Sequence, residues 1–494
     1  MKNSNHKIIS IIEYAIVCVT SLVLSFFITA YSPLHILTNG DVWTDSAVFK
    51  YVAMMMRRGY MPYRDTFDHK GPLLYVINYL GTFVSSYSGT WVVECLFIAV
   101  TVGVSYFLAK KISNRFWAVC TVIPVSSLII YFYFGGNSVQ EYAMPFMLVA
   151  LYIFINYEIS GKIGKLRLAI CGACLAVICM LQINMAALWV VFCIAILIEC
   201  IIGKEYKRLG HFILWFLIGF IVALIPMILW LALNGALIPC IEDYLLFNFK
   251  YIKSSWRNRA VAFSYFAKAP IVIISLILSV YSLIRRHNRL DIIHFTYLLF
   301  SLCMVAQSGI GESADYYGLM LVPTVVYPFS SFMYMFGEQC SDENISYSRN
   351  KLVIAGICVL LCGIMTYPII RRAENLRDKY NNPDEVRHSQ DVLSICNAID
   401  DVTDYDDRIT VWGNNDIIYL FSDRLSASKY SFQWPIGDVN PEIKDEYFDE
   451  LYANTPAAVV CGSENNLDEQ MRSFLNECGY YAYVEYGNMT LWVK

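Results

Sequence analysis

Long apolar stretches dominate this chain and limit what it can fold into. About eleven runs have the 17 to 25 residues that a helix needs to cross the hydrocarbon core of a bilayer. They lie at roughly 8–31, 90–109, 116–134, 141–158, 166–182, 184–202, 210–233, 260–284, 291–307, 317–336 and 351–370. With 57% hydrophobic and only 16% charged residues, the chain does not have the composition of a soluble globule. We therefore predict a polytopic α-helical membrane protein with about eleven transmembrane helices.

Charge separates the last quarter of the chain from the rest. Residues 372–494 hold 10 basic and 23 acidic side chains, whereas residues 1–371 hold 27 basic and 18 acidic ones. The high charge density after residue 371 is typical of a water-soluble domain, and the short apolar segments there predict a small α/β domain. Strands are expected at 408–412, 457–461 and within 480–493, and helices at 445–454 and 467–478. Nothing in this charge balance supports nucleic-acid binding.

Lysine and arginine predict the sidedness of the spans, because they are enriched in short cytoplasmic loops. Residues 72–88 are apolar, but they contain Gly81 and end in a serine-rich turn, so we treat them as a helix lying in the outer interface. The remaining basic clusters then share one face: Lys110, Lys111 and Arg115; Lys162, Lys165 and Arg167; Lys204, Lys207 and Arg208; Arg285, Arg286 and Arg289; Arg349 and Lys351. The domain after residue 371 is consequently expected on the extracytoplasmic side.

Two outer loops contain basic residues against this rule. They are Arg57, Arg58, Arg64 and Lys70 in the first loop, and Lys250, Lys253, Arg257 and Arg259 in a later one. The first outer loop, residues 32–89, also holds Asp41, Asp45, Asp65, Asp68 and His69. Its apolar spacing predicts an amphipathic helix over 45–58 lying on the membrane surface. In one interpretation, Asp45 only caps this helix and Asp65 only starts a turn. In another, the basic residues simply bind anionic lipid headgroups.

The order of residues in this loop resembles that of bacterial GT-C glycosyltransferases, in the family 39-like group related to dolichyl-phosphate-mannose protein mannosyltransferases and lipid A aminoarabinose transferases. Asp45-Ser46 opens the surface helix, Gly59 is followed by Pro62-Tyr63, and a charged cluster runs from Asp65 to Lys70-Gly71-Pro72. The string FGGNSVQEYAMPF, from Phe134, resembles a later loop and helix of that family, in which Glu141 starts a span at the outer face.

The resemblance implies an inverting, mannosyltransferase-like enzyme of the hexosyltransferase type. Its donor would be a polyprenyl-phosphate sugar, its acceptor an unidentified glycan, lipid or protein of the cell envelope, and its place the outer face of a bacterial plasma membrane. Asp45 is the expected general base, and Lys70, Arg64, Arg257 and Arg259 are the expected ligands of the donor phosphate. The alternative is a transporter or flippase of lipid-linked saccharides, which predicts ionisable residues deep within spans.

The remaining expectations concern the cavity, a metal and the domains. Residues expected to line a substrate cavity are Asp41, Asp65, Asp68, His69, Asn137, Glu141, Glu312 and Asp315, although polar residues at helix ends also arise from boundary solvation. Some GT-C enzymes use a divalent metal ion and others do not; here Asp68 and His69 are the candidate ligands, without a strict metal motif. We expect a GT-C-like transmembrane domain over 1–371 and an extracytoplasmic domain over 372–494, in which Cys396, Cys461 and Cys478 leave a disulfide open.

Overall fold

The computed structural model describes residues 2–37, 44–251, 260, 269–285, 292–308, 314–341, 349–381, 389–434, 436–462 and 467–494. Backbone contacts divide the chain into two compact units. The first, which we call the helical unit, comprises Met1–Ser32, Val92–Pro226 and Lys253–Asp378. The second, which we call the mixed unit, comprises Pro33–Trp91, Met227–Ile252 and Lys379–Lys494. Each unit is described by itself.

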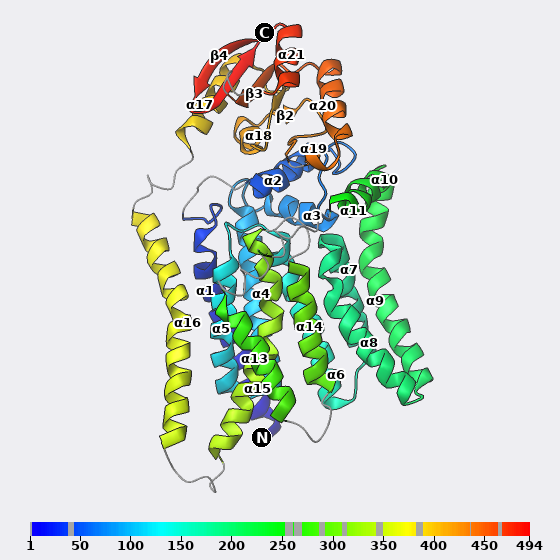
Figure 1. The fold of residues 1–494 in the computed structure, drawn as a ribbon, viewed down its shortest axis with the longest axis vertical. Coiled ribbons are helices and arrows are strands. Elements are labelled where there is room, and N and C mark those ends of the chain that lie inside the picture. Colours follow the sequence, from blue (N-terminus) through cyan, green and yellow to red (C-terminus); the bar gives the residue numbers. More distant parts are fainter. Residues whose placement is uncertain are drawn as a thin grey trace. The chain divides into compact units, whose positions relative to one another are not determined.

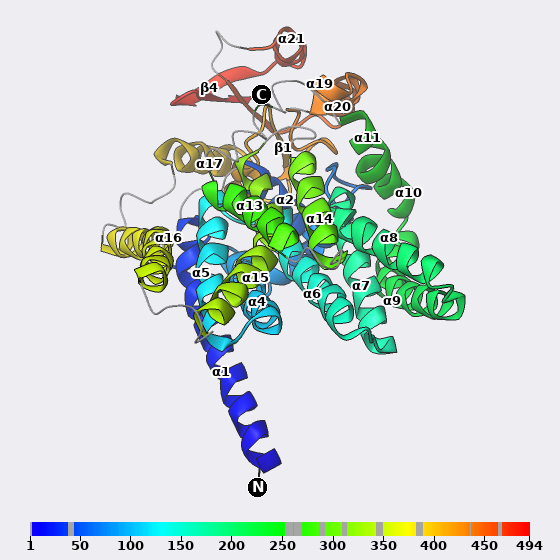
Figure 2. The same cartoon turned by 60° about the horizontal axis from the view of Figure 1, so that its bottom comes forward.

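The helical unit is built from long helices that pack side by side (Figure 1, Figure 2). Those that lie wholly or mainly in it are α1 (Lys2–Ile28), α4 (Gly89–Ile112), α5 (Arg115–Phe132), α6 (Val139–Ser160), α7 (Lys165–Leu181), α8 (Ala187–Ile202), α9 (Tyr206–Leu233), α13 (Pro270–Arg285), α14 (Ile292–Ser308), α15 (Val322–Ser341) and α16 (Arg349–Asn381). Neighbours in contact include α6 with α7, α15 with α5 and α13, and α14 with α8.

Small residues allow two of these helices to approach each other closely. A Cβ atom added at Gly172 of α7 would lie 1.9 Å from the carbonyl oxygen of Phe216 in α9. A Cβ atom added at Gly219 of α9 would lie equally close, at 1.9 Å, to the carbonyl oxygen of Ala169. Backbone contact at small residues is the usual way in which helices associate inside a bilayer, where apolar burial gives little driving force.

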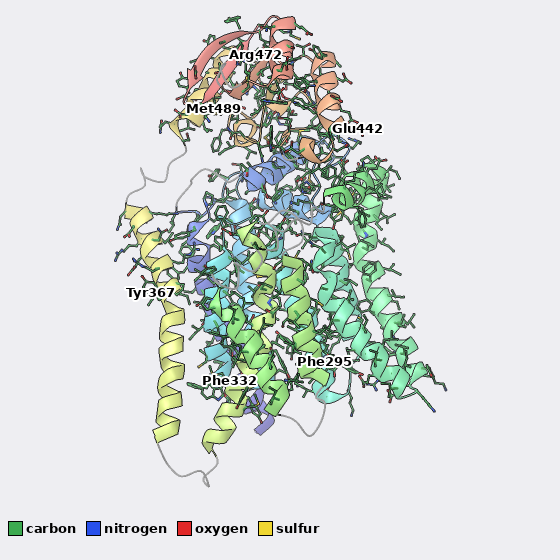
Figure 3. The ribbon with its side chains drawn as sticks, viewed as in Figure 1. Phe295, Phe332, Tyr367, Glu442, Arg472 and Met489 are labelled. Atoms are coloured by element: carbon green, nitrogen blue, oxygen red, sulfur yellow. The ribbon has the colours of Figure 1, made fainter. Side chains whose placement is uncertain are left out.

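Seven helices among the described residues are long and apolar enough to cross a membrane. Each of the eleven predicted spans contains a described helix, but α7, α13 and α14 have only 16 or 17 described residues, so the total of eleven stays a prediction. Large apolar side chains cover the outside of the unit, as at Phe295 and Tyr367, which are 54% and 55% exposed (Figure 3). Such a surface is suited to lipid, and the predicted class of polytopic α-helical membrane protein is confirmed.

The mixed unit contains the first outer loop. Its helices are α2 (Thr44–Arg57), α3 (Pro72–Gly81), α10 (Leu237–Cys240), the π-helical turn Ile241–Leu246, and α11 (Phe247–Tyr251). Helix α3 has ten residues and is therefore about 15 Å long, half the thickness of a bilayer core, so it is too short to be a span. The helix predicted over 45–58 is confirmed as α2, whereas its position on the membrane surface stays a prediction.

The C-terminal part of the mixed unit is a small α/β domain, as predicted. Its elements are α17 (Gln390–Val402), β1 (Arg408–Val411), α18 (Ile417–Ser422), β2 (Leu425–Ser426), α19 (Ile436–Val439), α20 (Glu442–Ala453), β3 (Ala458–Gly462), α21 (Glu469–Glu477), β4 (Tyr481–Tyr486) and β5 (Met489–Val493). The sheet has the order β2-β1-β3-β5-β4; β1 is parallel to β2 and β3, whereas β5 is antiparallel to β3 and β4. Cys396, Cys461 and Cys478 are free thiols.

The outer loop and the C-terminal domain pack against each other within the mixed unit. The ring centroids of Tyr51 and Tyr419 are 4.9 Å apart, and the Ser426 amide donates a 2.9 Å hydrogen bond to the Tyr51 hydroxyl. The Phe67 amide donates to the Lys429 carbonyl at 2.9 Å. Grouping by contact therefore divides the chain differently from the predicted boundary after residue 371, which rested on charge.

Candidate functional site

Helix α2 fixes the position of Asp45 in the outer loop. Asp45 lies in the first turn of α2 and is half-buried, and the helix dipole favours a carboxylate there. The helix is held by Lys50, whose ammonium is buried and donates to the carbonyls of Ser86 and Tyr87 at 3.2 and 2.7 Å. Burial lowers the pKa of Lys50 to about 8. This buried anchor, together with the contact between Tyr51 and Tyr419, leaves α2 little freedom to move.

Two residues with positive φ shape the turn that follows α2. Gly59 has φ +88° and ends the helix, which is the role that glycine fills best. Tyr63 has φ 67°, an unfavourable value for a bulky side chain, and its amide donates to the Thr66 carbonyl at 2.8 Å. Its hydroxyl then donates a 2.7 Å hydrogen bond to the carbonyl of Lys70. The unusual backbone at Tyr63 thereby positions the charged cluster further along the chain.

The charged cluster Asp68-His69-Lys70 is clamped through its backbone. Besides the bond from Tyr63, the Asn248 side chain donates to the carbonyl of His69 at 2.6 Å. The His69 amide donates to the Asp68 carboxylate at 2.6 Å, and the Lys70 ammonium lies 3.3 Å from Nε2 of His69. Asp68 and His69 are only 3% and 8% exposed, whereas Lys70 is half-buried. Of the three, Lys70 is the one that can reach a ligand.

The pKa of Asp68 depends on two residues that lie far apart in the sequence of the outer loop. Burial raises the pKa of Asp68 to about 6; Lys70 acts in the opposite direction, and Asp45 adds to the rise. Burial, reinforced by the neighbouring Lys70, holds the pKa of His69 well below its ordinary range, so the ring is neutral at pH 7. Asp45 and Lys70 thus both lie near enough to one carboxyl group to change its pKa, although 24 residues separate them in the sequence.

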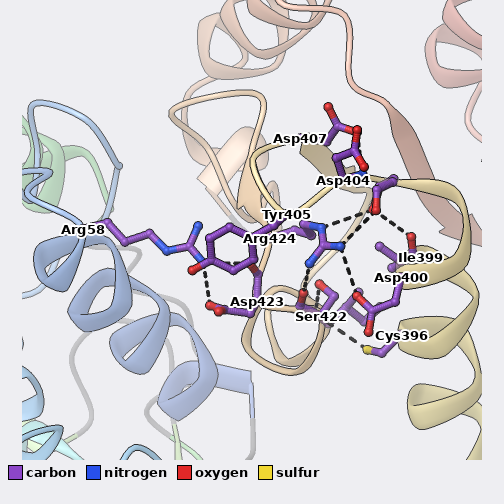
Figure 4. Close-up of polar contacts among 12 residues, drawn as sticks. Arg58, Cys396, Ile399, Asp400, Asp404, Tyr405, Asp407, Ser422, Asp423 and Arg424 are labelled. Carbon is purple, nitrogen blue, oxygen red and sulfur yellow. Dashed lines mark hydrogen bonds and ion pairs between the residues drawn. The ribbon is translucent and has the colours of Figure 1, made fainter.

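Two other basic residues of the loop, Arg64 and Arg58, have carboxylate partners inside the protein. The guanidinium of Arg64 forms 2.7 and 3.0 Å contacts with Asp65 and a 2.7 Å bond to the Asn234 carbonyl. Arg58 forms a 2.7 Å ion pair with Asp423 and stacks on Tyr405, next to a buried network around Arg424 (Figure 4). The positive charge that we expected to face an anionic donor is partly used for contacts with the protein itself.

Three buried carboxyl groups from distant segments influence one another, and the sequence analysis identified only Asp68 among them. Asp243, next to α11, forms a 3.2 Å ion pair with Lys429. Burial raises the pKa of Asp243 to about 6 and that of Asp416 to about 7, and Asp68 raises both. Asp416 is fully buried and accepts a 2.7 Å bond from the Ser431 hydroxyl. The only signal in the sequence for Asp243 is that Glu242 and Asp243 interrupt an apolar stretch.

The helical unit contains a second group of acidic and amide side chains. Glu141 is fully buried near the start of α6 and accepts a 2.8 Å bond from Ser138; it also hydrogen-bonds to Glu94 of α4. Tyr133 donates to Glu94, and Asn137 accepts a 2.8 Å bond from Tyr142. The sequence analysis missed Glu94, although an acidic residue inside an apolar run was a visible signal.

Asp315, which was also predicted to line the cavity, is exposed at the start of the turn Asp315–Leu321.

Four predicted site residues, Asp41, Arg257, Arg259 and Glu312, lie outside the described residues. For a metal, the described part of the chain offers no group of three or more His, Cys, Asp and Glu side chains that could hold the ion. The candidate pair Asp68 and His69 also has the Lys70 ammonium at 3.3 Å, which opposes binding of a second cation.

Comparison with known families and structures places the fold. Residues 2–334, two thirds of the chain, match a family described as "Putative competence-induced protein Ccs4 N-terminal domain". No curated protein matches the sequence.

Among solved structures, ArnT from Cupriavidus metallidurans bound to undecaprenyl phosphate is similar, with 11% identity, a TM-score of 0.61, and coverage of 97% of this chain and 98% of that one. The apo state of ArnT gives 10% identity, a TM-score of 0.62, and coverage of 98% of both chains. The oligosaccharyltransferase AglB from Archaeoglobus fulgidus, in complex with an inhibitory peptide and a dolichol-phosphate, gives 12% identity and a TM-score of 0.52, with coverage of 95% and 74%. These similarities confirm the predicted GT-C-like fold.

Proposed function

The chain belongs to the competence-induced Ccs4 N-terminal domain family, and from that premise and its GT-C-like fold we propose that it is a glycosyltransferase. It transfers a hexose-type sugar from a polyprenyl-phosphate donor to an acceptor of the cell envelope, with inversion, at the outer face of a bacterial plasma membrane. The observation that carries the proposal is that Asp45 and Lys70 both lie near enough to the Asp68 carboxyl group to change its pKa. A base and a cation for a departing phosphate are the two groups that this reaction needs.

In the proposed reaction, the carboxylate of Asp45 accepts the proton of an acceptor hydroxyl. The hydroxyl oxygen forms a bond to the anomeric carbon as the bond from that carbon to the phosphate oxygen breaks, on the opposite side of the sugar. The pair of electrons leaves with the polyprenyl phosphate, which is a stable anion and needs no proton from an acid. One general base and one cation therefore suffice, and attack opposite the leaving group inverts the anomeric centre.

Lys70 is the proposed cation for the phosphate, and His69 positions it. Because the pKa of His69 is held low by burial and by Lys70, its ring is neutral and can accept a hydrogen bond from the ammonium at 3.3 Å. The backbone clamps from Tyr63 and Asn248 fix the direction in which the Lys70 side chain leaves the loop. Arg64 is a weaker candidate because Asp65 already neutralises it at 2.7 Å.

A direct test uses the purified full-length protein in proteoliposomes with a panel of isotopically labelled undecaprenyl-phosphate hexoses and membrane extract. We expect label from one donor to move into an extract component, with release of unlabelled undecaprenyl phosphate. Release of undecaprenyl phosphate without transfer of the sugar to an acceptor would contradict the proposal. So would the absence of turnover of every donor by protein that remains folded.

A transporter or flippase of lipid-linked saccharides is the second candidate, and the buried pair Glu94–Glu141 favours it. Both carboxyl groups are fully buried in the helical unit, where transporters keep coupling groups. A scrambling assay with fluorescent lipid-linked sugars in liposomes distinguishes the two functions. Movement of donor between leaflets that stops in Glu141→Gln, without sugar transfer, would favour the transporter.

A further inference from the structure

The helical unit contains an apolar cavity among its helices. The cavity has a volume of about 840 Å³ and lies between α1, α4, α5 and α16. Its lining includes Ile12, Ile16, Val102, Val119, Val122 and Ile369. Apolar side chains form most of the wall, so an occupant must be apolar along most of its length.

A polar depression adjoins one end of this cavity. It has a volume of about 550 Å³, lies at the turn between α4 and α5, and is lined by Lys110, Ser113, Asn114, Arg115 and Phe116. Arg115 lines both hollows, so the polar depression and the apolar cavity meet at its side chain. The Asn114 side chain, which lines this depression, caps α5 by accepting a 3.1 Å hydrogen bond from the Trp117 amide.

The charges at the junction are unequal. Glu13 of α1 is paired with two cations, Lys110 at 2.5 Å and Arg115 at 2.9 Å. One carboxylate cannot neutralise both, and Lys111 beside them is exposed. The Arg115 side chain is itself 59% exposed, so part of its guanidinium remains available to a second anion. The junction therefore combines excess positive charge with an apolar chamber.

We propose that this composite hollow binds one anionic glycerophospholipid of the cytoplasmic leaflet. Its phosphodiester lies in the polar depression against Lys110 and Arg115, and an acyl chain occupies the apolar cavity between α1 and α16. The loop between α4 and α5 belongs to the face that the charge pattern assigns to the cytoplasm, whereas the donor sugar must reach the outer loop. A lipid with a zwitterionic headgroup binds less well, because its own cation meets Lys110 and Arg115.

The test is native mass spectrometry of the full-length protein after exchange into nanodiscs that contain phosphatidylglycerol or phosphatidylcholine. We expect one phosphatidylglycerol molecule to stay bound after detergent release and phosphatidylcholine to be retained at least tenfold less. The double variant Lys110→Gln/Arg115→Gln removes the headgroup contacts, and Val122→Trp fills the chamber; each should reduce the retained phosphatidylglycerol at least tenfold.

A matched control removes two positive charges from the next loop of the same face. Lys162 and Arg167 are exposed and line neither hollow, so Lys162→Gln/Arg167→Gln should keep the bound lipid. Equal retention of both lipids, or equal loss in the control and in the double variant, would overturn the proposal. So would displacement of phosphatidylglycerol by equimolar undecaprenyl phosphate, because the hollow would then hold the tail of a polyprenyl lipid. Size-exclusion profiles of all variants report folding separately.

Discussion

The two units of this protein each bury acidic side chains, but they compensate them differently. In the mixed unit, the buried carboxyl of Asp68 has a cation, Lys70, on one side and a second carboxylate, Asp45, on another. In the helical unit, the partners of Glu94 and Glu141 include each other, the hydroxyl groups of Ser32, Tyr133 and Ser138, and the backbone of Asn137 and Ser138. The first arrangement keeps charges of both signs near one point, which suits a reaction with an anionic leaving group. The second arrangement surrounds two carboxyl groups with neutral hydrogen-bond donors, which suits a structural role or proton binding.

The basic residues of the outer loop differ in the partners that surround their charges. In the outer loop, Arg58 forms an ion pair with Asp423 and Arg64 forms one with Asp65, whereas Lys70 lies 3.3 Å from the neutral ring of His69 and acts electrostatically on the buried Asp68. An arginine in a direct ion pair with a carboxylate already has its charge compensated by that partner. We therefore propose Lys70, rather than Arg58 or Arg64, as the cation of the loop that binds the donor phosphate.

The largest effect is expected from Asp45→Asn. Loss of a general base lowers the turnover rate by a factor of roughly 10² to 10⁴, with little change in donor affinity. The measurement is initial rate of sugar transfer in proteoliposomes with the donor identified in the panel. Asp391→Asn is the matched control, because Asp391 is an exposed aspartate in the first turn of α17 in the same unit. Equal rates in Asp45→Asn and the unmodified protein would break the assignment of a base to the mixed unit.

Lys70→Gln is expected to have the next largest effect. Removing a cation that stabilises a departing phosphate should lower kcat by roughly 10²-fold, and Lys70→Arg should recover part of the loss. Because the effect is on the leaving group, a donor with a better leaving group than the polyprenyl phosphate should be affected less. An unchanged kcat accompanied only by weaker donor binding would restrict Lys70 to holding the substrate.

Asp68→Asn should change the pH dependence of stability. The pKa of Asp68 is about 6 in the fold against an ordinary 3.8, so its contribution to stability is present below pH 4 and is lost as pH rises through 6. At pH 7.5 the Asn variant should consequently have a higher Tm and a free energy of unfolding that is greater by up to about 3 kcal/mol. At pH 4 it should have no advantage. Thermal unfolding in detergent between pH 4 and 8 measures this. A lower Tm for the variant at pH 7.5 would mean that Lys70 compensates Asp68 more than burial costs.

Much of the fold could be predicted because its signals are local. The long apolar runs predicted the spanning helices, and the spacing of Val48, Tyr51, Val52 and Met55 predicted α2. The alternating segments after residue 371 predicted β1, β3, α20, α21 and the closing strands. Each of these signals depends on residues within one element, so tertiary contacts were not needed to interpret it.

The candidate site was only half predictable because its other half is assembled over long range. Asp45 and Lys70 could be named from the order of residues in one loop. Asp416 and Lys429 come from the C-terminal domain and Asp243 from the turn Ile241–Leu246, so they come near Asp68 only through tertiary packing, which no local pattern encodes. The neutral state of His69 likewise depends on burial among such segments. Residues that act through their neighbours can be identified only when the tertiary structure is known.

The smallest effect is expected from Arg58→Gln, and it tests the comparison most selectively. Arg58 and Asp423 form a pair whose side chains are 21% and 52% exposed, and such pairs contribute about 0 to 1 kcal/mol to stability. If cations paired within the loop do not bind the donor, Arg58→Gln should change the transfer rate less than twofold and lower Tm only slightly, by an amount that diminishes in high salt. Parallel rate and Tm measurements on Arg58→Gln and Lys70→Gln separate the two kinds of cation. A rate loss in Arg58→Gln as large as that in Lys70→Gln would show that the loop binds its anion through overall positive charge, with no distinction between a paired arginine and a lysine beside a neutral ring.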